Sequence, residues 1–439
     1  MAVEHPHIVV LGAGFGGLEF CKHFHDPNAR ITLVDQTNHH LFQPLLYQVA
    51  TAGLSAPDIA QPIRSIFSDR PNINVLLDWV CDIKLDEKKV FLSGGNVLTY
   101  DYLVLALGSC TSYFGHPEWE RFAPGLKNLR DAVEIRSRIL LAFEKAESEG
   151  VPDDLQSLMT IAVVGGGPTG VELAGACAEL THHVLKADFR RIDAAQARII
   201  LIEGAPRVLA AMSPESSESG RKQLENLGVQ VLTGVRVKNI SEGRVDLDTG
   251  ETIHAATIIW AAGVCAVPLA KKLGVELDHG GRIKVNPDTS VPGHPEVFAI
   301  GDIASLLQED GKPVPGVSPA AMQMGRHAAR IIENELAFPG AVVRPPFKYW
   351  DKGTMATIGR SAAVADIGRL HISGFPAWLA WLAVHLVFLV GFRNKIAVMF
   401  QWFYSYIAYK RGARIIAHGL GENPCATSET TVAPKQKAA

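Results

Sequence analysis

The stretch HIVVLGAGFGGLEF (His7–Phe20), with the following segment ITLVDQ that reaches Asp35, decides the expected fold. An apolar run, a glycine-rich turn and an alternating apolar and polar segment are typical of a strand, a tight turn and a helix. In Gly12-x-Gly14-x-x-Gly17 the first glycine permits the turn, the second lets the backbone approach a pyrophosphate, and the third lets the helix pack on the strand. Asp35 then stands where a carboxylate accepts hydrogen bonds from a ribose. The stretch predicts a dinucleotide-binding unit.

A second copy of this pattern begins at IAVVGGGPTGVELAG (Ile161–Gly175), which carries Gly165-x-Gly167-x-x-Gly170. Its next apolar strand, IILIEG, ends at Glu203. An acid at this position repels a 2′-phosphate, so the second unit is expected to favour NAD(H) over NADP(H). The sequence therefore contains a diverged internal repeat of two dinucleotide-binding units.

The two copies share a later hairpin and differ in one insertion. Predicted hairpins turn at Ser93–Asn96 and at Asp248–Gly250. Only the first copy contains NHHLFQPLLYQVATAGL (Asn38–Leu54), which we expect to serve a ligand unique to the first site. The chain returns with VFAIGDIA (Val297–Ala304), another buried strand that ends in Gly-Asp.

These patterns predict an α/β fold with two Rossmann-like domains, the second inserted into the first, and C-terminal amphipathic helices. The expected boundaries are 1–115 and 276–365 for the first domain, 116–154 for a connecting helical segment, 155–275 for the second domain, 366–419 for a C-terminal region and 420–439 for a polar tail.

Composition supports a large folded core. The 439 residues are 47% hydrophobic and 20% charged with a net charge of −3, which argues against disorder and against a general basic surface for nucleic acid. The six cysteines form no C-x-x-C pair, so Cys265, without a cysteine nearby in sequence, is interpreted as a spectator. The first strand starts within about seven residues, so we expect no targeting segment and a cytoplasmic chain.

On these motifs the chain resembles the type II NADH:quinone oxidoreductases, which are flavoproteins with two dinucleotide-binding domains, through about residue 418. The resemblance implies non-covalent FAD in the first unit, NADH in the second and a quinone as acceptor. The implied FAD residues are Gly12, Gly14, Phe15, Gly16, Gly17, Asp35, Gln43, Pro44, Leu45, Leu46, Tyr47, Val80, Ala106, Gly108, Asp302, Ala320 and Lys352. The implied NADH residues are Gly165, Gly167, Pro168, Thr169, Gly170, Glu172, Glu203 and Gly263.

The resemblance also implies catalytic residues. Glu172 would pair with Lys352 of Asp351-Lys352-Gly353 and relay protons to reduced quinone; alternatively, the two form a structural ion pair. Gln323 keeps one of two glutamines that many relatives carry, whereas Pro319 replaces the other and has no donor for a quinone carbonyl. The implied quinone residues are Gln48, Pro319, Gln323 and Met355, and they leave ubiquinone and menaquinone open.

The C-terminal region is apolar. Pro376–Gly391 and Ile396–Tyr409 contain no charged residue. In the second segment Ile396, Met399, Phe400, Phe403 and Ile407 form a stripe at helical spacing. Aromatics typical of a lipid–water boundary accompany them, namely Trp378, Trp381, Trp402, Tyr404, Tyr406 and Tyr409, and so do the flanking cations Arg393, Lys395, Lys410, Arg411 and Arg414. An interfacial anchor, a dimer contact or buried core, and a membrane span remain as alternatives.

The resulting hypothesis is a peripheral, non-proton-pumping NADH:quinone oxidoreductase on the cytoplasmic face of a bacterial inner membrane. Family resemblance adds a homodimer, and we expect no metal and no nucleic acid. One alternative is a sulfide:quinone oxidoreductase, which needs cysteines close to the flavin; Cys110 and Cys265 show no evident match to that pattern. The other is a slow-turnover redox sensor resembling apoptosis-inducing factor.

Overall fold

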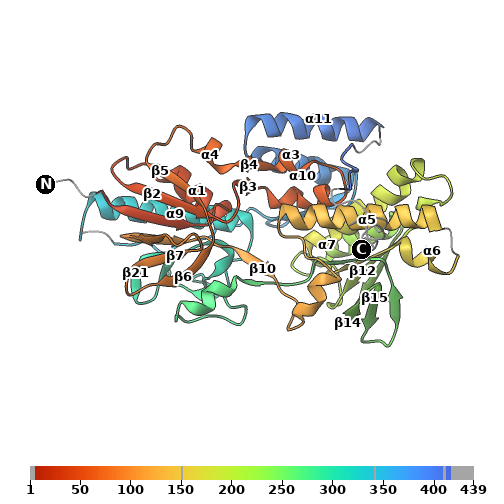
Figure 1. The fold of residues 1–439 in the computed structure, drawn as a ribbon, viewed down its shortest axis with the longest axis horizontal. Coiled ribbons are helices and arrows are strands. Elements are labelled where there is room, and N and C mark those ends of the chain that lie inside the picture. Colours follow the sequence, from red (N-terminus) through yellow and green to blue (C-terminus); the bar gives the residue numbers. More distant parts are fainter. Residues whose placement is uncertain (1–4, 150–151, 341–342, 409–411, 417–439) are drawn as a thin grey trace, which may run out of the picture.

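Two α/β units, each built on a parallel sheet, lie end to end in the computed structural model (Figure 1), which describes residues 5–149, 152–340, 343–408 and 412–416. The first sheet has the order β20-β21-β9-β1-β2-β5 and is parallel except for the edge strand β20. Its strands are β1 (His7–Leu11), β2 (Arg30–Asp35), β5 (Ile73–Leu77), β9 (Tyr102–Leu105), β20 (Ser290–Val291) and β21 (His294–Ala299).

The second sheet repeats this plan with the order β13-β12-β11-β17, all parallel. Its strands are β11 (Thr160–Val164), β12 (Arg198–Glu203), β13 (Val229–Thr233) and β17 (Thr257–Trp260). Alternate residues of β11 point to opposite faces: Ile161 and Val163 pack with α7, whereas Ala162 and Val164 pack with the antiparallel strands below. Both faces are covered, which explains the continuous apolar runs in these strands. The predicted repeat is confirmed.

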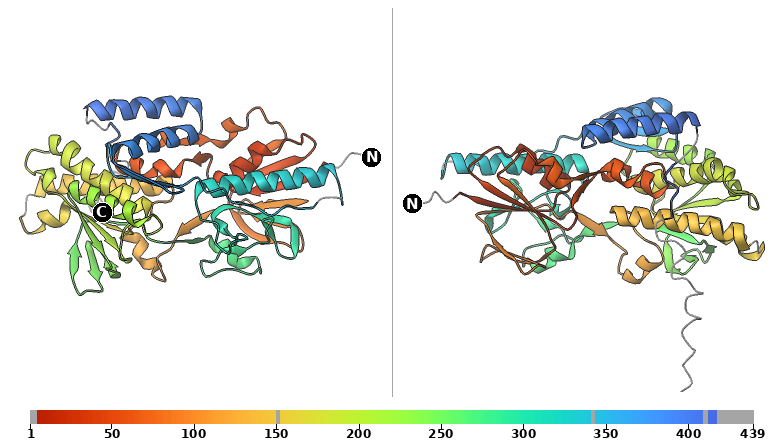
Figure 2. Two further views of the ribbon diagram at one scale, coloured as in Figure 1. Left: turned by 180° about the vertical axis from the view of Figure 1, so that it is seen from behind. Right: turned by 45° about the horizontal axis from the view of Figure 1, so that its top comes forward.

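Each parallel sheet has helices on one face and a small antiparallel sheet on the other (Figures 1 and 2). In the first unit the covering elements are α1 (Phe15–His23), α9 (Ser318–Ala337), β6 (Val80–Lys84), β7 (Lys89–Leu92) and β8 (Val97–Thr99). In the second they are α5 (Leu129–Glu149), α6 (Pro152–Leu158), α7 (Pro168–Glu179), α8 (Pro214–Asn226), β14 (Val237–Ser241), β15 (Arg244–Leu247) and β16 (Thr252–His254). Both predicted hairpin turns are confirmed by the pairing of β7 with β8 and of β15 with β16.

The insertion Asn38–Leu54 lies between the two units. It forms β3 (His39–Leu41), which pairs with β4 (Ala60–Pro62), and α2 (Leu46–Ala50), which packs against α5 and α7. The short helices α3 (Ala56–Ile59) and α4 (Ile63–Ile66) follow. The chain crosses between the units twice, through β10 (Ser109–Thr111) and β18 (Val264–Ala266), and these crossings pair as a two-stranded antiparallel sheet.

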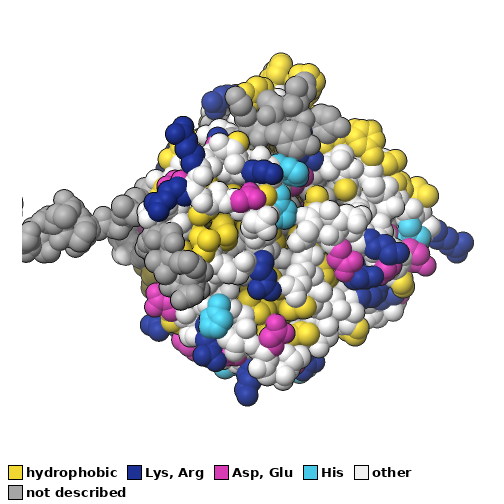
Figure 3. Space-filling model, turned by 90° about the vertical axis from the view of Figure 1, so that its right-hand side faces the viewer, with side chains coloured by type: hydrophobic (Ala, Val, Ile, Leu, Met, Phe, Trp, Pro, Cys, Tyr) yellow, Lys and Arg dark blue, Asp and Glu magenta, His cyan; other side chains and the backbone are white. Residues whose placement is uncertain are grey.

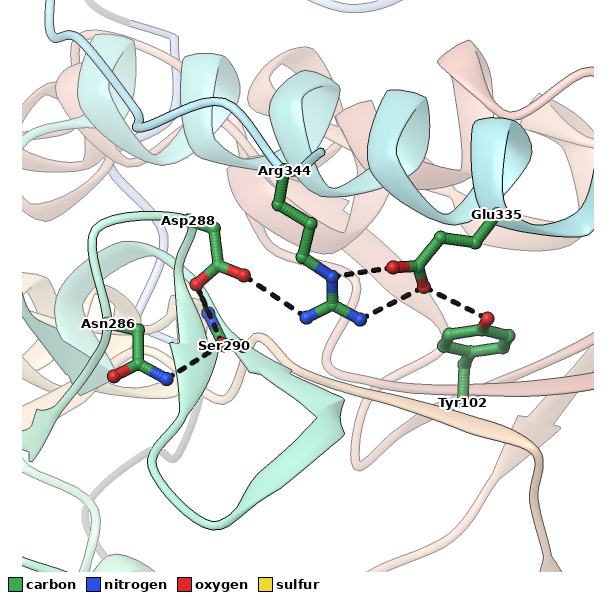
Figure 4. A network of polar contacts seen from close by, with 6 residues as sticks. All are labelled: Tyr102, Asn286, Asp288, Ser290, Glu335 and Arg344. Carbon is green, nitrogen blue, oxygen red and sulfur yellow. Dashed lines mark hydrogen bonds and ion pairs between the residues drawn. The ribbon is translucent and has the colours of Figure 1, made fainter. Parts of the chain in front are cut away.

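A partly buried polar network ties the end of α9 to the edge of the first sheet (Figure 4). The Arg344 guanidinium donates to both carboxylate oxygens of Glu335 at 2.6 and 2.9 Å and to Asp288 at 3.1 Å. The Tyr102 hydroxyl donates to Glu335 at 3.0 Å. Because Arg344 is mostly buried, this paired arrangement fixes the returning segment against β9 and β20.

The C-terminal region covers the junction of the two units. The antiparallel strands β23 (Thr354–Thr357), β24 (Ala363–Ile367) and β25 (Leu370–Ser373) carry α10 (Phe375–Phe388), and α11 (Phe392–Ala408) packs on α3 and α10. α10 ends where Leu389 becomes extended and Gly391 adopts a φ of +89°. Within the described ranges, no helix combines the length and the apolar character needed to cross a bilayer.

The two C-terminal helices differ in amphipathicity. α11 buries Asn394 and Val398 and exposes Met399, Phe400 and Phe403, so the predicted apolar stripe faces away from the protein. α10 is apolar on its exposed as well as its buried side, so the predicted amphipathic character does not hold for it. Of the other predicted boundary residues, Tyr409, Lys410 and Arg411 lie outside the described residues, and the side chains of Tyr406 and Ile407 are not described.

Candidate functional site

The first glycine fingerprint forms an open cradle at the start of α1. A Cβ on Gly12, whose φ is +99°, would lie 2.4 Å from the Ala106 carbonyl oxygen, and a Cβ on Gly17 would lie 1.9 Å from the Gly12 oxygen. These two glycines are therefore required by packing. A Cβ on Gly14 would meet nothing within 4 Å, so Gly14 faces free space at the N-terminus of the helix. An anion fits this position, because the first helical N–H groups have no intrahelical partner.

Asp35 holds the cradle together from the end of β2. Its carboxylate accepts hydrogen bonds from the amides of Ala13 and Thr37, both at 2.7 Å. Beside it, the Asp78 amide donates to the Asp35 carbonyl oxygen at 3.0 Å, which brings the segment before Val80 to the same sheet edge. Trp79 in this segment is 61% exposed. An apolar surface next to the Asp35 carboxylate fits an aromatic ring such as adenine, and Val80 lies at the end of this segment.

The opposite side of the first cradle is formed by the ends of β9 and β21. Asp302, which follows β21, accepts a hydrogen bond from the Ser109 hydroxyl at 2.8 Å, and Lys127 donates to the same hydroxyl at 3.1 Å. Gly108 begins this segment with a φ of +70°. The side chains of Ala106 and Ala320 are buried, and a Cβ on Gly16 would touch Ile300. The predicted FAD residues from these strands thus lie together at the carboxyl ends of a parallel sheet, where such sheets bind ligands.

The predicted flavin residues of the insertion divide into two groups. Leu45 and Leu46 are fully buried in the core between the units, and Gln43 is exposed and donates to the Lys127 carbonyl oxygen at 2.9 Å. The two leucine side chains thus pack in the core, and the Gln43 side chain holds the backbone at Lys127. Tyr47 faces a different cavity, described below. Phe15, at the first turn of α1, packs edge-on against His40 and Phe42 of the insertion.

The second fingerprint forms a similar open cradle at the start of α7. A Cβ on Gly165 would lie 2.6 Å from Ala261, and one on Gly170 would lie 1.8 Å from the Gly165 oxygen, whereas Gly167 faces free space. Pro168 and Thr169 are exposed beside it at the start of α7. This cradle therefore fits a second dinucleotide.

The acid of the second cradle and the end of β17 complete this site. Glu203 accepts hydrogen bonds from the amides of Gly166 and Ala205. Gly263 has a φ of +77°, and a Cβ there would lie 2.5 Å from the Phe114 ring. Phe114, which the sequence did not indicate, covers the Gly263 backbone with a ring that is 67% exposed. The Phe114 ring therefore occupies the side of Gly263 on which a side chain would lie.

Glu172 and Lys352 form no ion pair in the part of the chain that the structure describes, and the catalytic roles expected for them stay predictions. Glu172 is buried on α7 and accepts a hydrogen bond from the Thr357 amide at 3.3 Å. The pKa of Glu172 is raised to about 8 because burial disfavours the carboxylate. Hydrogen bonding by the Thr357 amide and the Trp381 side chain lowers the pKa, but by less than burial raises it. Lys352 is exposed, and its ammonium lies 5.0 Å from the Trp350 ring centroid. Thr357 belongs to β23, which packs against α7, whereas Lys352 lies before the start of this strand.

Gln323 positions the segment that contains Lys352. Its amide nitrogen donates to the Trp350 carbonyl oxygen at 3.0 Å, and its amide oxygen accepts from the Trp350 amide at 2.9 Å. Both polar atoms are therefore engaged with the backbone. Pro319 stands in the first turn of α9, and Met355 is half-buried in β23. These three predicted quinone residues do not line the cavity that contains Gln48.

That cavity of about 100 Å³ lies between the insertion, α7 and the C-terminal helices. Gln48 accepts a hydrogen bond from the Trp402 indole at 2.8 Å and donates to the Tyr47 hydroxyl at 2.9 Å. Most of the surface is aromatic or aliphatic, and the lining residues are Tyr47, Gln48, Thr51, Gly53, Ala176, Glu179, Val184, Thr357, Gly359, Arg360, Trp378, Trp381, Leu382 and Trp402. An apolar cavity with a few polar groups fits a flat, hydrophobic ring.

The sequence missed the cavity because it assigned its tryptophans to a lipid boundary. Trp381 is buried, stacks on His385 with ring centroids 4.0 Å apart, and lies beside Trp402. Burial lowers the pKa of His385 to about 4, so this ring is neutral at physiological pH. The spacing of Trp378, Trp381 and His385 along one helical face was the available signal.

Comparison with known families places both parts of the chain. Residues 6–325 match the family described as pyridine nucleotide-disulphide oxidoreductase, and residues 351–410 match the NDH2 C-terminal domain. A type II NADH:quinone oxidoreductase of Mycobacterium tuberculosis is 43% identical over 92% of this chain and 89% of its own sequence. A probable NADH dehydrogenase of Dictyostelium discoideum is 28% identical over 91% of this chain and 89% of its own.

Solved structures share the fold. NDH2 from Plasmodium falciparum, determined in complex with NADH, superimposes with a TM-score of 0.86 at 20% identity, covering 94% of this chain and all of that one. The sulfide:quinone oxidoreductase of Aquifex aeolicus gives a TM-score of 0.70 at 19% identity, covering 92% and 95%.

Proposed function

Because the chain belongs to the type II NADH:quinone oxidoreductases, we propose a division of labour between its two cradles and its cavity. The protein is an FAD-dependent, non-proton-pumping NADH:quinone oxidoreductase, and its family favours this function over sulfide oxidation and over a slow redox sensor. We assign FAD to the cradle of Gly14 and NADH to that of Gly167. Quinone is assigned to the cavity beside Gln48.

The observation that carries the assignment is the pair of matched cradles, each with one glycine facing free space. When bound, FAD accepts a hydride from NADH and passes two electrons on. The protein would supply position: the helix N-termini would hold the phosphates, Asp35 and Glu203 would face the riboses, and Asp302 and Ser109 would lie beside the first dinucleotide. The insertion, which occurs only in the first copy, lines the cavity assigned to quinone through Tyr47, Gln48, Thr51 and Gly53.

Anaerobic stopped-flow spectroscopy tests the function through its two half-reactions. NADH should bleach the absorbance of the bound flavin, and ubiquinone or menaquinone should restore it. Because Glu203 is an acid, NADPH should bleach the flavin more slowly than NADH. Bleaching by sulfide without NADH would support the sulfide:quinone oxidoreductase alternative instead.

The position of the quinone site is tested by Leu382→Trp. Leu382 lines the cavity from α10, so the larger indole fills much of its space of about 100 Å³. We expect the KM for quinone to rise by about tenfold, equivalent to about 1.4 kcal/mol, while NADH bleaches the flavin at the wild-type rate. The matched control is Val384→Trp, on the same helix but 39% exposed and outside the cavity lining. Equal effects of both substitutions would place the quinone elsewhere.

We further assign the exposed apolar face of the C-terminal helices to a lipid surface. Met399, Phe400, Phe403 and Tyr404 are each more than 40% exposed on α11, and Leu379 and Val387 extend the face on α10. Hydrophobic side chains gather along the upper rim of the molecule, the level at which Figure 1 places these helices (Figure 3). This face lies next to the cavity assigned to quinone, so an acceptor dissolved in lipid would have a short path.

Vesicle binding tests this face. The double substitution of Phe400→Ser and Phe403→Ser removes two exposed rings, each worth about 1.5–3 kcal/mol when buried. We expect sedimentation with anionic lipid vesicles to weaken by about 100-fold or more, without loss of flavin. Phe338→Ser, an equally exposed ring at the end of α9, is the control and should leave binding unchanged. Unchanged binding by the double variant would exclude the lipid assignment.

Two finer assignments complete the proposal. The lipid surface is the cytoplasmic face of a bacterial inner membrane, and the protein acts as a homodimer, as the family resemblance suggests. Protease accessibility in inverted and right-side-out vesicles tests the first, and the mass of the detergent-solubilised protein tests the second.

A further inference from the structure

The two crossings between the units bring together cysteines that are 155 residues apart. β10 leaves the first unit after β9, and β18 returns from the second unit after β17. Their antiparallel register sets Cys110 directly opposite Cys265. Strand pairing thus supplies Cys265 with a partner that sequence spacing did not reveal.

The geometry of this pair suits a disulfide. The two sulfur atoms are 3.3 Å apart, and both residues are half-buried. Directly opposed residues on antiparallel strands have Cα atoms about 4.5–5.5 Å apart. This separation lies within the range of about 4.4–6.8 Å that disulfides span, so side-chain rotation without backbone rearrangement is sufficient to form the bond.

We propose that Cys110 and Cys265 form a reversible disulfide that joins the two crossings, a modification site separate from the NADH:quinone reaction. The oxidant is a low-molecular-weight disulfide such as oxidised glutathione. One cysteine sulfur attacks it and releases one thiol, and the second cysteine then attacks the mixed disulfide and releases the other. The two cysteines lose two protons and two electrons, and the reagent disulfide is reduced to two thiols.

The cross-link would act next to the cradle assigned to FAD. Ser109, adjacent to Cys110, binds Asp302, so the strand that carries the disulfide also carries a contact of the first cradle. Each crossing begins at a glycine with positive φ, Gly108 at +70° and Gly263 at +77°. These two glycines are the points where the backbone turns out of each unit, and a bond between the crossings would restrict movement there.

The surroundings of Cys110 determine the pH at which the exchange reaction should be run. Burial, reinforced by the neighbouring Cys265, raises the pKa of Cys110 to about 11, and Lys127 only partly offsets this. The thiolate is the attacking species, so exchange is slow at neutral pH. The experiment is therefore run for hours at a mildly alkaline pH.

Mass spectrometry of the FAD-loaded protein tests the bond directly. After incubation with excess oxidised glutathione, acid quench and alkylation, a peptide joining Cys110 to Cys265 should appear, with a mass loss of two hydrogens, and dithiothreitol should remove it. Cys81→Ser, which replaces an exposed cysteine, should still give this peptide. A glutathione adduct that persists on either cysteine, or free thiols at both, would overturn the proposal.

Thermal release of flavin gives an independent readout. The bond closes a loop of more than 150 residues, which restricts the unfolded chain, so oxidised protein should release FAD at a temperature higher by the order of 5 °C. Cys110→Ser and Cys265→Ala should remove this shift while Cys81→Ser keeps it. A shift that persists in both variants, or no shift in protein whose linked peptide is present, would contradict the coupling to the first cradle.

Discussion

Gly167→Val is expected to raise the KM for NADH by about 100-fold and to leave the flavin bound. The residue has a φ of −72° and a ψ of 179°, which valine adopts without strain. A Cβ at this position meets no protein atom within 4 Å, so the fold should not change. The added side chain would occupy the space assigned to the pyrophosphate and cost about 2.7 kcal/mol of binding. Steady-state kinetics, with the flavin content measured by absorbance, checks the result.

The repeat provides a matched control in Gly14→Val. Gly14 has the same open environment in the first cradle, so this variant should fold but lose its yellow colour on purification. The two substitutions should therefore separate the two ligands. If Gly167→Val lost flavin and kept its affinity for NADH, the assignment of the cradles would have to be reversed.

Glu172→Gln is expected to stabilise the protein increasingly as the pH rises. The pKa of Glu172 is about 8 in the folded protein because burial disfavours its charged form, against an ordinary value of 4.5. The folded state therefore binds the proton more tightly than the unfolded state. This contribution to stability is complete below the unfolded pKa and is lost as the pH rises toward and through about 8. Glutamine cannot ionise, so the variant does not lose it.

From these values, the stability advantage of the variant should be about 3 kcal/mol larger at about pH 8.5 than at about pH 5.5. Urea unfolding at the two pH values measures the difference. Glu251→Gln, at an exposed position, reports any general effect of replacing a carboxylate. If the difference in free energy of unfolding between the variant and the wild type were the same at both pH values, the pKa of Glu172 would not be raised in the folded protein.

The parts of the fold that the sequence predicted are those fixed by local geometry. Gly12 and Gly17 are required by atoms a few residues or one strand away, and the same holds for Gly165 and Gly170. Such local constraints can be recognised from one short stretch of sequence. The hairpin turns and the acids at the strand ends were predictable for the same reason.

The remaining features depend on how distant segments meet. Nothing near Lys352 in sequence indicates that Thr357 takes the place beside Glu172, because this follows from how β23 docks on α7. Trp381 and Trp402 have the composition of a membrane boundary but face inward, since α10 and α11 pack on the insertion. The apolar stripe of α11 was predicted correctly, whereas the aromatic side chains of both helices had to be located by the structure.

Because the second unit is inserted into the first, the second sheet can be completed before the first sheet while the chain is being synthesised. β11 to β17 form an uninterrupted run, so the second sheet has all its strands once about 260 residues have been made. The first sheet has to wait for β21, which pairs with β9 across almost 200 residues. Until then β9 presents an unpaired edge, which is prone to aggregation. The nascent N-terminal strands are therefore where a ribosome-associated chaperone would be needed.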